Sequence, residues 1–404
     1  MQIVLIILIV ALVAKDTSYL GDPYIMRGFA QGLCLIVGGM WLVTNISGLI
    51  LKRYWPVFGY LAIILVATME TRDPVYVLWQ VASLAAVIFF FIAYFETERK
   101  KGYPHAVLVN TTLIAFSLVA MLSLVLAKYL PSLAYVTLYG GELRFRGLYG
   151  SPGMLASTAG VLIGFAWFSI KRKWLKLILI LVAAVCLEMT LSRTFWVALA
   201  LAGTATAWRY RWMARKWIVS VAVAILLLAS FLIVFGIHLD TQSADRIVRS
   251  DSITNLTGRV SLWEAALKAF YQRPFIGYGF TTGSNGLEAV EGRIFESGAS
   301  SIESARSAGR ETMHSGYIQS LLDSGLIGTI LYISVMGMAL SSIMKYGKEK
   351  RFAPYFFALL FLMIANIAEN VIYSASVFSS ILFWGVAIFA ISLKGSKQIR
   401  VEKT

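Results

Sequence analysis

Long apolar stretches, each followed by a short polar segment, recur along almost the whole 404-residue chain. An apolar run of about 20 residues is long enough to cross a bilayer core of about 30 Å as a helix. The pattern predicts twelve such spans. They are expected near residues 1–14, 29–51, 55–69, 75–95, 105–127, 152–170, 174–191, 194–208, 217–237, 315–344, 353–373 and 375–393. The expected fold class is therefore an all-α polytopic membrane protein.

One long segment, residues 238–314, interrupts this rhythm. It is too long for a simple turn between spans and too short for an independent enzyme domain. It divides the chain into three expected parts. Residues 1–237 form an N-terminal bundle of about nine spans, residues 238–314 form a loop or lid, and residues 315–404 form about three spans and a tail.

Within this segment, the stretch "GRVSLWEAALKAFYQRPF" at 258–275 has Leu262, Ala266 and Phe270 at intervals of four residues. This spacing predicts an amphipathic helix that lies near the membrane surface. The Ser-, Gly- and Ala-rich stretch at 296–309 has no such period and is expected to be mobile.

The composition supports the membrane assignment. The mean hydropathy is +0.74, 58% of the residues are hydrophobic and only 14% are charged, which excludes an ordinary water-soluble domain. Cys34 and Cys186 both lie in apolar runs, which argues against a disulfide framework or a zinc site. No basic residue precedes the apolar run at 1–14, which argues against a cleaved signal peptide.

The net charge of +15 comes largely from basic clusters that follow alternate spans. These clusters lie at Lys52 and Arg53, 98–101, 171–173, 209–216, 345–351 and the tail from Lys394. Basic residues are enriched in cytoplasmic loops, so all six clusters are expected on the cytoplasmic side, with both termini cytoplasmic. The long segment 238–314 then faces outward.

Four outward-facing arginines are not explained by this charge rule: Arg144, Arg146, Arg193 and Arg259. A guanidinium is costly at membrane depth, so it faces a cavity, a partner or the headgroups. One interpretation is four separate anchors to lipid headgroups. The other is that several arginines converge on one phosphorylated substrate, since Arg matches phosphate oxygens bidentately. Glu188 is a candidate partner for Arg193.

His314 lies where a polar stretch gives way to a predicted span, in "TMHSGYIQSLLDSG". One interpretation is a histidine that bonds the backbone at a helix N-terminus. The other is a general base, because a free imidazole titrates near neutral pH and can take a hydroxyl proton. His105, on the cytoplasmic side, and His238, at the end of a span, are weaker candidates.

Two function classes remain at this point, an enzyme and a transporter. The sequence contains no P-loop, no H-E-x-x-H and no Asp-x-Asp pair, so the enzyme interpretation is a metal-free reaction at a phosphorylated substrate. Intramembrane charge also marks transport pathways. However, charged residues at mid-span, paired broken helices and inverted halves are not evident from the sequence.

Four motifs together resemble one known family. They are "RGLYGSPGMLA" at 146–156, "LSRTFWVALALAG" at 191–203, "TGRVSLWEAALKAFYQRPFIGYGF" at 257–280 and "HSGYIQSLLDSGLIGTILY" at 314–332. In order and spacing they resemble the O-antigen ligase and polymerase superfamily, glycosyltransferases of the bacterial inner membrane that use lipid-linked donors. The resemblance covers about residues 140 to 345. One departure is Ser315, where the family often has Asn or a second His.

The resemblance implies a GT-C-like fold with a large periplasmic loop that contains short helices. It implies transfer of glycan from an undecaprenyl-diphosphate donor to a hydroxyl of the lipid A core, at the periplasmic face of the inner membrane. No cofactor and no metal are expected. An O-antigen or exopolysaccharide polymerase of the same superfamily is the alternative enzyme. A lipid-linked oligosaccharide transporter is the alternative from a different class.

The resemblance also implies roles for particular residues. His314 is the expected general base of a single inverting displacement, and the outer arginines are expected to bind the diphosphate. Aromatic residues of the lid and of the His314 span are candidate contacts for sugar or acceptor. The residues expected at the site are His314, then Arg193, Arg259, Arg144 and Arg146, then Trp263, Tyr278 and Tyr317.

Overall fold

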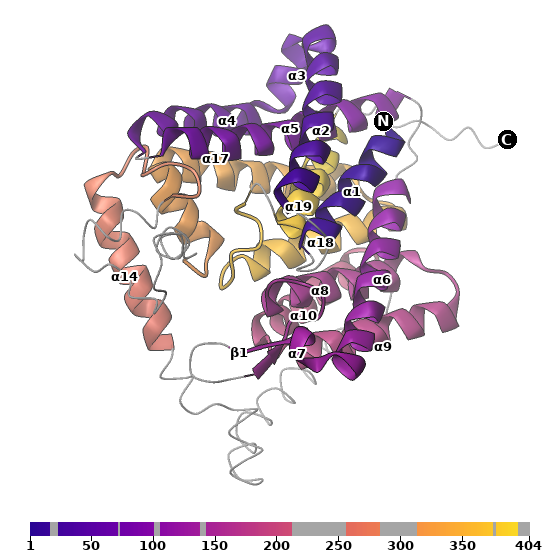
Figure 1. Ribbon diagram of the computed structural model, residues 1–404. Helices are drawn as coiled ribbons and strands as arrows, with labels where there is room; N and C mark the ends of the chain where they lie inside the picture. The colour runs from indigo at the N-terminus through magenta and orange to yellow at the C-terminus, as the bar shows by residue number, and fades with distance from the viewer. Residues whose placement is uncertain are drawn as a thin grey trace, which may run out of the picture.

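A computed structural model of the protein describes residues 1–16, 23–71, 73–100, 106–137, 143–211, 256–282, 313–374 and 377–394. Most of these residues are helical (Figure 1). The elements are α1 (Gln2–Asp16), α2 (Pro23–Asn45), α3 (Gly48–Arg53), α4 (Trp55–Val66), η1 (Ala67–Glu70), α5 (Pro74–Lys100), α6 (Ala106–Tyr129), α7 (Pro131–Ala134), β1 (Tyr135–Thr137), β2 (Leu143–Phe145), α8 (Pro152–Ser169), α9 (Lys173–Met189), α10 (Arg193–Arg209), α14 (Leu256–Gln272), α17 (Gly316–Tyr346), η2 (Lys350–Phe352), α18 (Ala353–Ala365) and α19 (Phe378–Ser392).

The helices confirm an all-α membrane protein. Within the described residues, five helices are long and apolar enough to cross a membrane, and three shorter apolar helices accompany them. The five lie at Arg27–Asn45, Pro74–Arg99, Val107–Tyr129, Pro152–Ser169 and Gly316–Tyr346. The count of twelve spans and the GT-C-like fold stay predictions. The predicted span 217–237, the stretch 296–309, His105 and His238 lie outside the described residues.

The segment before α8 contains a small sheet that the sequence pattern did not predict. Strands β1 and β2 pair antiparallel, with Tyr135 opposite Phe145 and Val136 opposite Arg144. The rings of Tyr135 and Phe145 lie 5.4 Å apart, and Phe145 is fully buried. Three-residue strands are too short to show a clear alternation of apolar and polar positions.

The described parts of four basic clusters lie near one another at one end of the bundle. The ring of Phe389 on α19 lies 5.2 Å from Phe95 on α5 and 6.0 Å from Phe352 in η2. The hydroxyl of Tyr210, just after α10, donates to the carbonyl of Gly347, just after α17, at 2.8 Å. These contacts join neighbours of the clusters at 98–101, 209–216, 345–351 and Lys394. The side of the membrane that this end faces stays a prediction.

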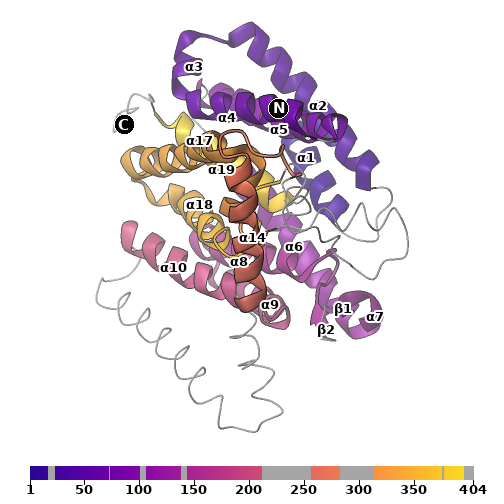
Figure 2. The same ribbon diagram turned by 90° about the vertical axis from the view of Figure 1, so that its left-hand side faces the viewer.

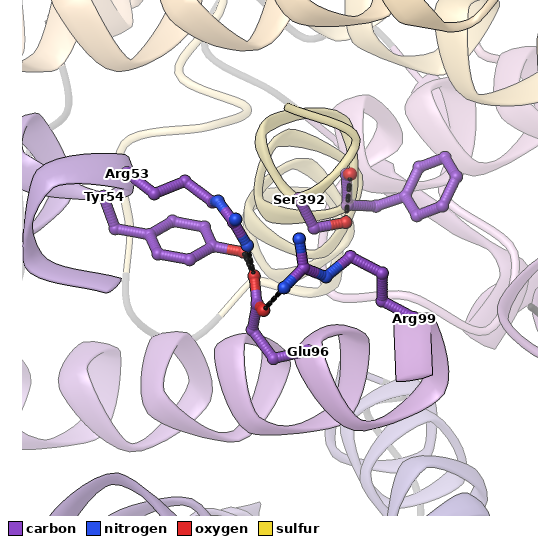
Figure 3. Close-up of polar contacts among 6 residues, drawn as sticks. Arg53, Tyr54, Glu96, Arg99 and Ser392 are labelled. Carbon is purple, nitrogen blue, oxygen red and sulfur yellow. Dashed lines mark hydrogen bonds and ion pairs between the residues drawn. The ribbon is translucent and has the colours of Figure 1, made fainter. Parts of the chain in front are cut away.

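A buried carboxylate ties two of these clusters together (Figure 3). Glu96 on α5 forms ion pairs with Arg53 and, at 2.9 Å, with Arg99, and it accepts a hydrogen bond from the Tyr54 hydroxyl at 2.9 Å. The two guanidinium groups reach the carboxylate from different sides. Removing one member of such a buried pair leaves an uncompensated charge. The cluster therefore fixes the junction of α3 and α4 against α5.

Close helix contacts in the middle of the bundle depend on two glycines. Gly160 and Gly164 lie one turn apart on α8, and a Cβ atom at either position would overlap the ring of Phe361 or Phe357 on α18. Small residues at this spacing let membrane helices approach closely. The contact between α8 and α18 is therefore a ring-against-backbone contact.

The predicted amphipathic helix is confirmed as α14, which ends at Gln272, two residues before Pro274. In Figure 1, α4 and α17 run across the picture, whereas α14 runs down its left-hand side; in Figure 2 it passes in front of the bundle. Its buried face, Ala265, Ala266 and Ala269, packs on Met313 and Leu322. The helix therefore lies across the end of the bundle opposite the basic clusters.

The predicted span at 315–344 corresponds to α17, but this helix is interrupted at Gly325. Gly325 has a φ of 63° and a ψ of −167°, which breaks α17 into two helical pieces. Glycine adopts positive φ without the steric cost that a Cβ atom imposes. The break lies where α14 and the loop after it contact α17.

Candidate functional site

His314 occupies the loop immediately before α17, at the same end of the bundle as α14. Its side chain is 51% exposed, and its Nδ1 lies 3.8 Å from Oε2 of Glu369, in the loop after α18. Its backbone φ of 47° lies in the left-handed region. A non-glycine residue in this region costs energy and persists only where its surroundings hold it. The sequence analysis identified His314 but not Glu369.

Hydrogen bonds on both sides hold His314 in this conformation. The preceding residue, Met313, donates its N–H to Oε1 of Gln319 at 3.1 Å and accepts a bond from Trp263 Nε1 at 2.8 Å. On the other side, the N–H of Gly316 donates to the carbonyl of Asn366 at 3.0 Å. The His314 backbone is therefore held between α14, α17 and the loop after α18.

Asn366 connects the His314 loop to the loop that carries Glu369. It is fully buried, its Oδ1 accepts the N–H of Ile372 at 3.1 Å, and its Nδ2 donates to the Tyr332 hydroxyl at 3.3 Å. A Cβ atom at Gly316 would overlap this side chain. Glycine after the His-Ser pair is therefore required by the close approach of Asn366.

The break in α17 exposes backbone groups that the loop after α14 satisfies. Tyr278 and Gly279 donate their N–H groups to the carbonyls of Leu322 and Asp323 at 3.0 and 2.9 Å. In the other direction, the N–H of Leu326 donates to the carbonyl of Pro274 at 2.7 Å. Unpaired backbone groups are costly away from water. The "RPFIGYGF" and "LLDSG" motifs therefore fold as one unit.

A buried acid belongs to the same unit. Asp323 is fully buried, and its Oδ2 accepts the N–H of Thr281 at 2.7 Å while its Oδ1 accepts from Gln319 Nε2 at 2.9 Å. Neither the buried acid nor the break at Gly325 was predicted from the sequence. The available signal was the pair of Asp323 and Gly325 within an otherwise apolar run.

The four expected arginines come from three parts of the chain: α10, the segment of β2 and α14. Arg193 is exposed at the first turn of α10, whose Phe195 packs near Phe361 of α18. Arg144 is half-buried on β2, and Arg146 donates from Nε to the carbonyl of Leu133 at 3.2 Å. Arg259 belongs to α14, but its side chain lies outside the described residues. Glu188 is exposed in the last turn of α9.

The three expected aromatic contacts use their polar atoms within the protein. The Trp263 indole bonds Met313, the Tyr278 hydroxyl donates to the carbonyl of Ala269 at 3.0 Å, and the Tyr317 hydroxyl donates to the carbonyl of Met363 at 2.9 Å. Burial raises the pKa of Tyr278, against the opposing effect of Arg273. Stacking of these rings on a sugar stays a prediction.

Comparison with known protein families identifies the region that contains these elements. Residues 178–333 match a family described as O-antigen ligase. No curated protein matches the chain. The matched region begins in α9 and extends through His314 into α17, and it includes three of the four motifs noted in the sequence. The match supports the resemblance seen in the sequence, because residues 178–333 are similar to the O-antigen ligase family.

Proposed function

We propose that the protein is an O-antigen ligase that transfers glycan from undecaprenyl diphosphate to a hydroxyl of the lipid A core. The observation that carries the proposal is the exposed His314 beside Glu369, held in a left-handed conformation at the end of the bundle opposite the basic clusters. The proposal places this end at the periplasmic face of the inner membrane, with both termini cytoplasmic.

In this mechanism His314 is the general base. Its Nδ1 faces Glu369 at 3.8 Å, which leaves Nε2 for the acceptor hydroxyl. The acceptor oxygen loses its proton to Nε2 and attacks the anomeric carbon of the donor sugar. The bond from that carbon to the diphosphate oxygen breaks, and the oxygen keeps the electron pair. A single displacement inverts the anomeric configuration.

Glu369 supports the base in the proposed reaction. When His314 takes the proton, it becomes a cation beside a carboxylate. A carboxylate at Nδ1 orients the imidazole and stabilises the imidazolium, as the acid does in hydrolytic triads. The separation of 3.8 Å is longer than a hydrogen bond, and catalytic contacts are often longer before substrate binds.

The arginines bind the leaving diphosphate in the proposal. Arg193 and Arg259 are the principal groups, and Arg144 and Arg146 form a second clamp on donor or acceptor phosphates. Preorganised cations at the position where charge develops lower the barrier without a metal ion. Trp263, Tyr278 and Tyr317 offer ring faces to sugar or acceptor.

The transporter interpretation is favoured by one observation, the buried Asp323 next to the break in α17. In transporters, the groups freed by such a break coordinate substrate or ions. Here the carbonyls of Leu322 and Asp323 accept bonds from the loop after α14, and both oxygens of Asp323 are also bonded. These bonds support the enzyme over the transporter.

The proposal is tested by transfer in vitro. Purified protein is mixed with an undecaprenyl-diphosphate-linked glycan and rough lipopolysaccharide in EDTA, and His314→Ala is compared with wild type and with a His105→Ala control. If wild type and His105→Ala glycosylate lipopolysaccharide and His314→Ala does not, the ligase is supported. If the lipid-linked chains grow longer and no lipopolysaccharide is glycosylated, the protein is a polymerase. Neither product, together with movement of the donor across vesicles, would indicate the transporter.

A further inference from the structure

We propose that Gln319, with Asp323 behind it, is a positioning residue for His314, and this inference rests on the proposed function. Both side chains act through the backbone of Met313, the residue before His314.

The two side chains belong to a continuous chain of hydrogen bonds. The N–H of Thr281 donates to Asp323, Gln319 donates to Asp323, the N–H of Met313 donates to Gln319, and Trp263 donates to the carbonyl of Met313. The chain begins in the loop after α14 and ends on α14 itself. It passes through one turn of α17, where Gln319 and Asp323 lie four residues apart.

Because these side chains are buried, each polar atom in this chain of bonds has a fixed role as donor or acceptor. Gln319 is 5% exposed and Asp323 is fully buried, so a polar atom without a partner there is costly. A carboxylate accepts and cannot donate, so the amide nitrogen of Gln319 must face Asp323. The amide oxygen must then face the N–H of Met313. A side chain that donates at one atom and accepts at the other is required at position 319.

The need for such a device follows from the conformation of His314. With a φ of 47°, the residue would relax to negative φ if its neighbours were released. That rotation would swing the imidazole away from Glu369. Met313 is held at both its N–H and its carbonyl, so it is the point at which the rotation is prevented.

The test exchanges the polarity of the Gln319 and Asp323 pair. In Gln319→Glu two carboxylates face each other, and the bond between residues 319 and 323 has no donor. In Asp323→Asn two amides face each other, and one N–H of the chain of bonds meets another N–H instead of an oxygen. The double variant Gln319→Glu with Asp323→Asn restores the bonds from the N–H groups of Met313 and Thr281 and the bond between the pair. In that last bond, residue 323 now donates and residue 319 accepts. Ser320→Ala is the matched control, since the buried hydroxyl of this residue lies 3.4 Å from Ser324 Oγ and 3.3 Å from Thr329 Oγ1 and is outside the chain of bonds.

Glycan transfer to rough lipopolysaccharide gives the first measurement. Each single variant is expected to lower kcat about 100-fold, because a misplaced base loses the attack geometry, while KM changes less than about threefold. The double variant is expected to recover kcat to within about tenfold of wild type, and the control to match wild type.

Histidine resonances give a second measurement that does not depend on transfer. The chain has three histidines, so ¹⁵N-histidine protein in nanodiscs gives few imidazole signals, and His314→Gln assigns the one of interest. The single variants are expected to split or broaden the His314 signal, and the double variant to return it to one set.

The outcomes separate the two proposals. If wild type transfers glycan and the single variants keep both their kcat and the wild-type His314 signal, the positioning role is refuted and the ligase stands. If the single variants lose kcat and the double variant does not regain it, the positioning role is also refuted. If wild type transfers nothing, the ligase fails, and the His314 signal alone decides whether Gln319 and Asp323 set the conformation.

Discussion

Substitution of Gly277 by alanine measures how much the contact between the loop after α14 and the break in α17 contributes to the stability of the protein. Gly277 has a φ of 78°, and a Cβ atom there would lie 2.5 Å from the carbonyl oxygen of Leu322 and 2.7 Å from that of Asp323. Alanine in a left-handed conformation costs about 1–2 kcal/mol. Both obstacles are backbone atoms, so no side-chain rotation relieves the overlap.

The loop must therefore separate from α17, and the bonds from Tyr278 and Gly279 are lost. Each backbone bond contributes about 1 kcal/mol net, so with the strain the expected loss is about 3–4 kcal/mol. The assay is SDS titration in mixed micelles, followed by circular dichroism. Gly337→Ala is the control, because this glycine lies in the same α17 with nothing within 4 Å of its Cβ position. If Gly277→Ala is as stable as Gly337→Ala, the contact does not hold the loop.

Four other results are expected. Glu369→Gln is expected to slow transfer about tenfold or more, since the imidazolium of His314 loses its carboxylate partner, and single-turnover rates measure this; an unchanged rate would exclude Glu369 from the reaction. Trp263→Phe keeps an aromatic side chain but has a smaller ring and loses the bond to Met313, so we expect a loss of at least about 1 kcal/mol of stability and a lower kcat; wild-type values in both would contradict the role of Trp263 in holding Met313. Glu96→Gln is expected to lower stability by about 1–3 kcal/mol with normal transfer by the folded protein, because it leaves two arginines with a neutral partner at the far end. Transfer is expected to persist in EDTA; loss that magnesium or manganese restores would show that the reaction needs a metal ion.

The fold was predictable where the spacing of apolar residues, or a single proline, determines the structure of a segment. The amphipathic helix α14 follows from the spacing of Leu262, Ala266 and Phe270 and from the stop at Pro274. The position of the described basic clusters at one end is what the charge rule predicts when an even number of spans separates them. Both features follow from patterns that can be read along the chain without knowledge of its long-range contacts.

The features that sequence reasoning missed depend on distant partners. The break at Gly325 is possible because the backbone of residues 274–279 forms hydrogen bonds with the N–H and carbonyl groups that the break leaves unpaired. A hydropathy pattern contains no information about those hydrogen bonds. The predicted span 353–373 hid Glu369, because the helix ends at Ala365 and the apolar residues after it form a loop tied by Asn366. His314 was identifiable as a polar residue next to an apolar run, but its partner lies 55 positions later in the sequence.

The hydrogen bonds of Gln319 and Asp323 have a consequence for changes to the stretch before His314. Asp323 holds Thr281 and Gln319 holds Met313, so both ends of the intervening stretch are fastened within one helical turn of α17. Because α17 itself holds both ends, a change of length or sequence between Thr282 and Met313 is expected to leave His314 in place. An affinity tag or a protease site inserted there is therefore expected to keep the position of the histidine.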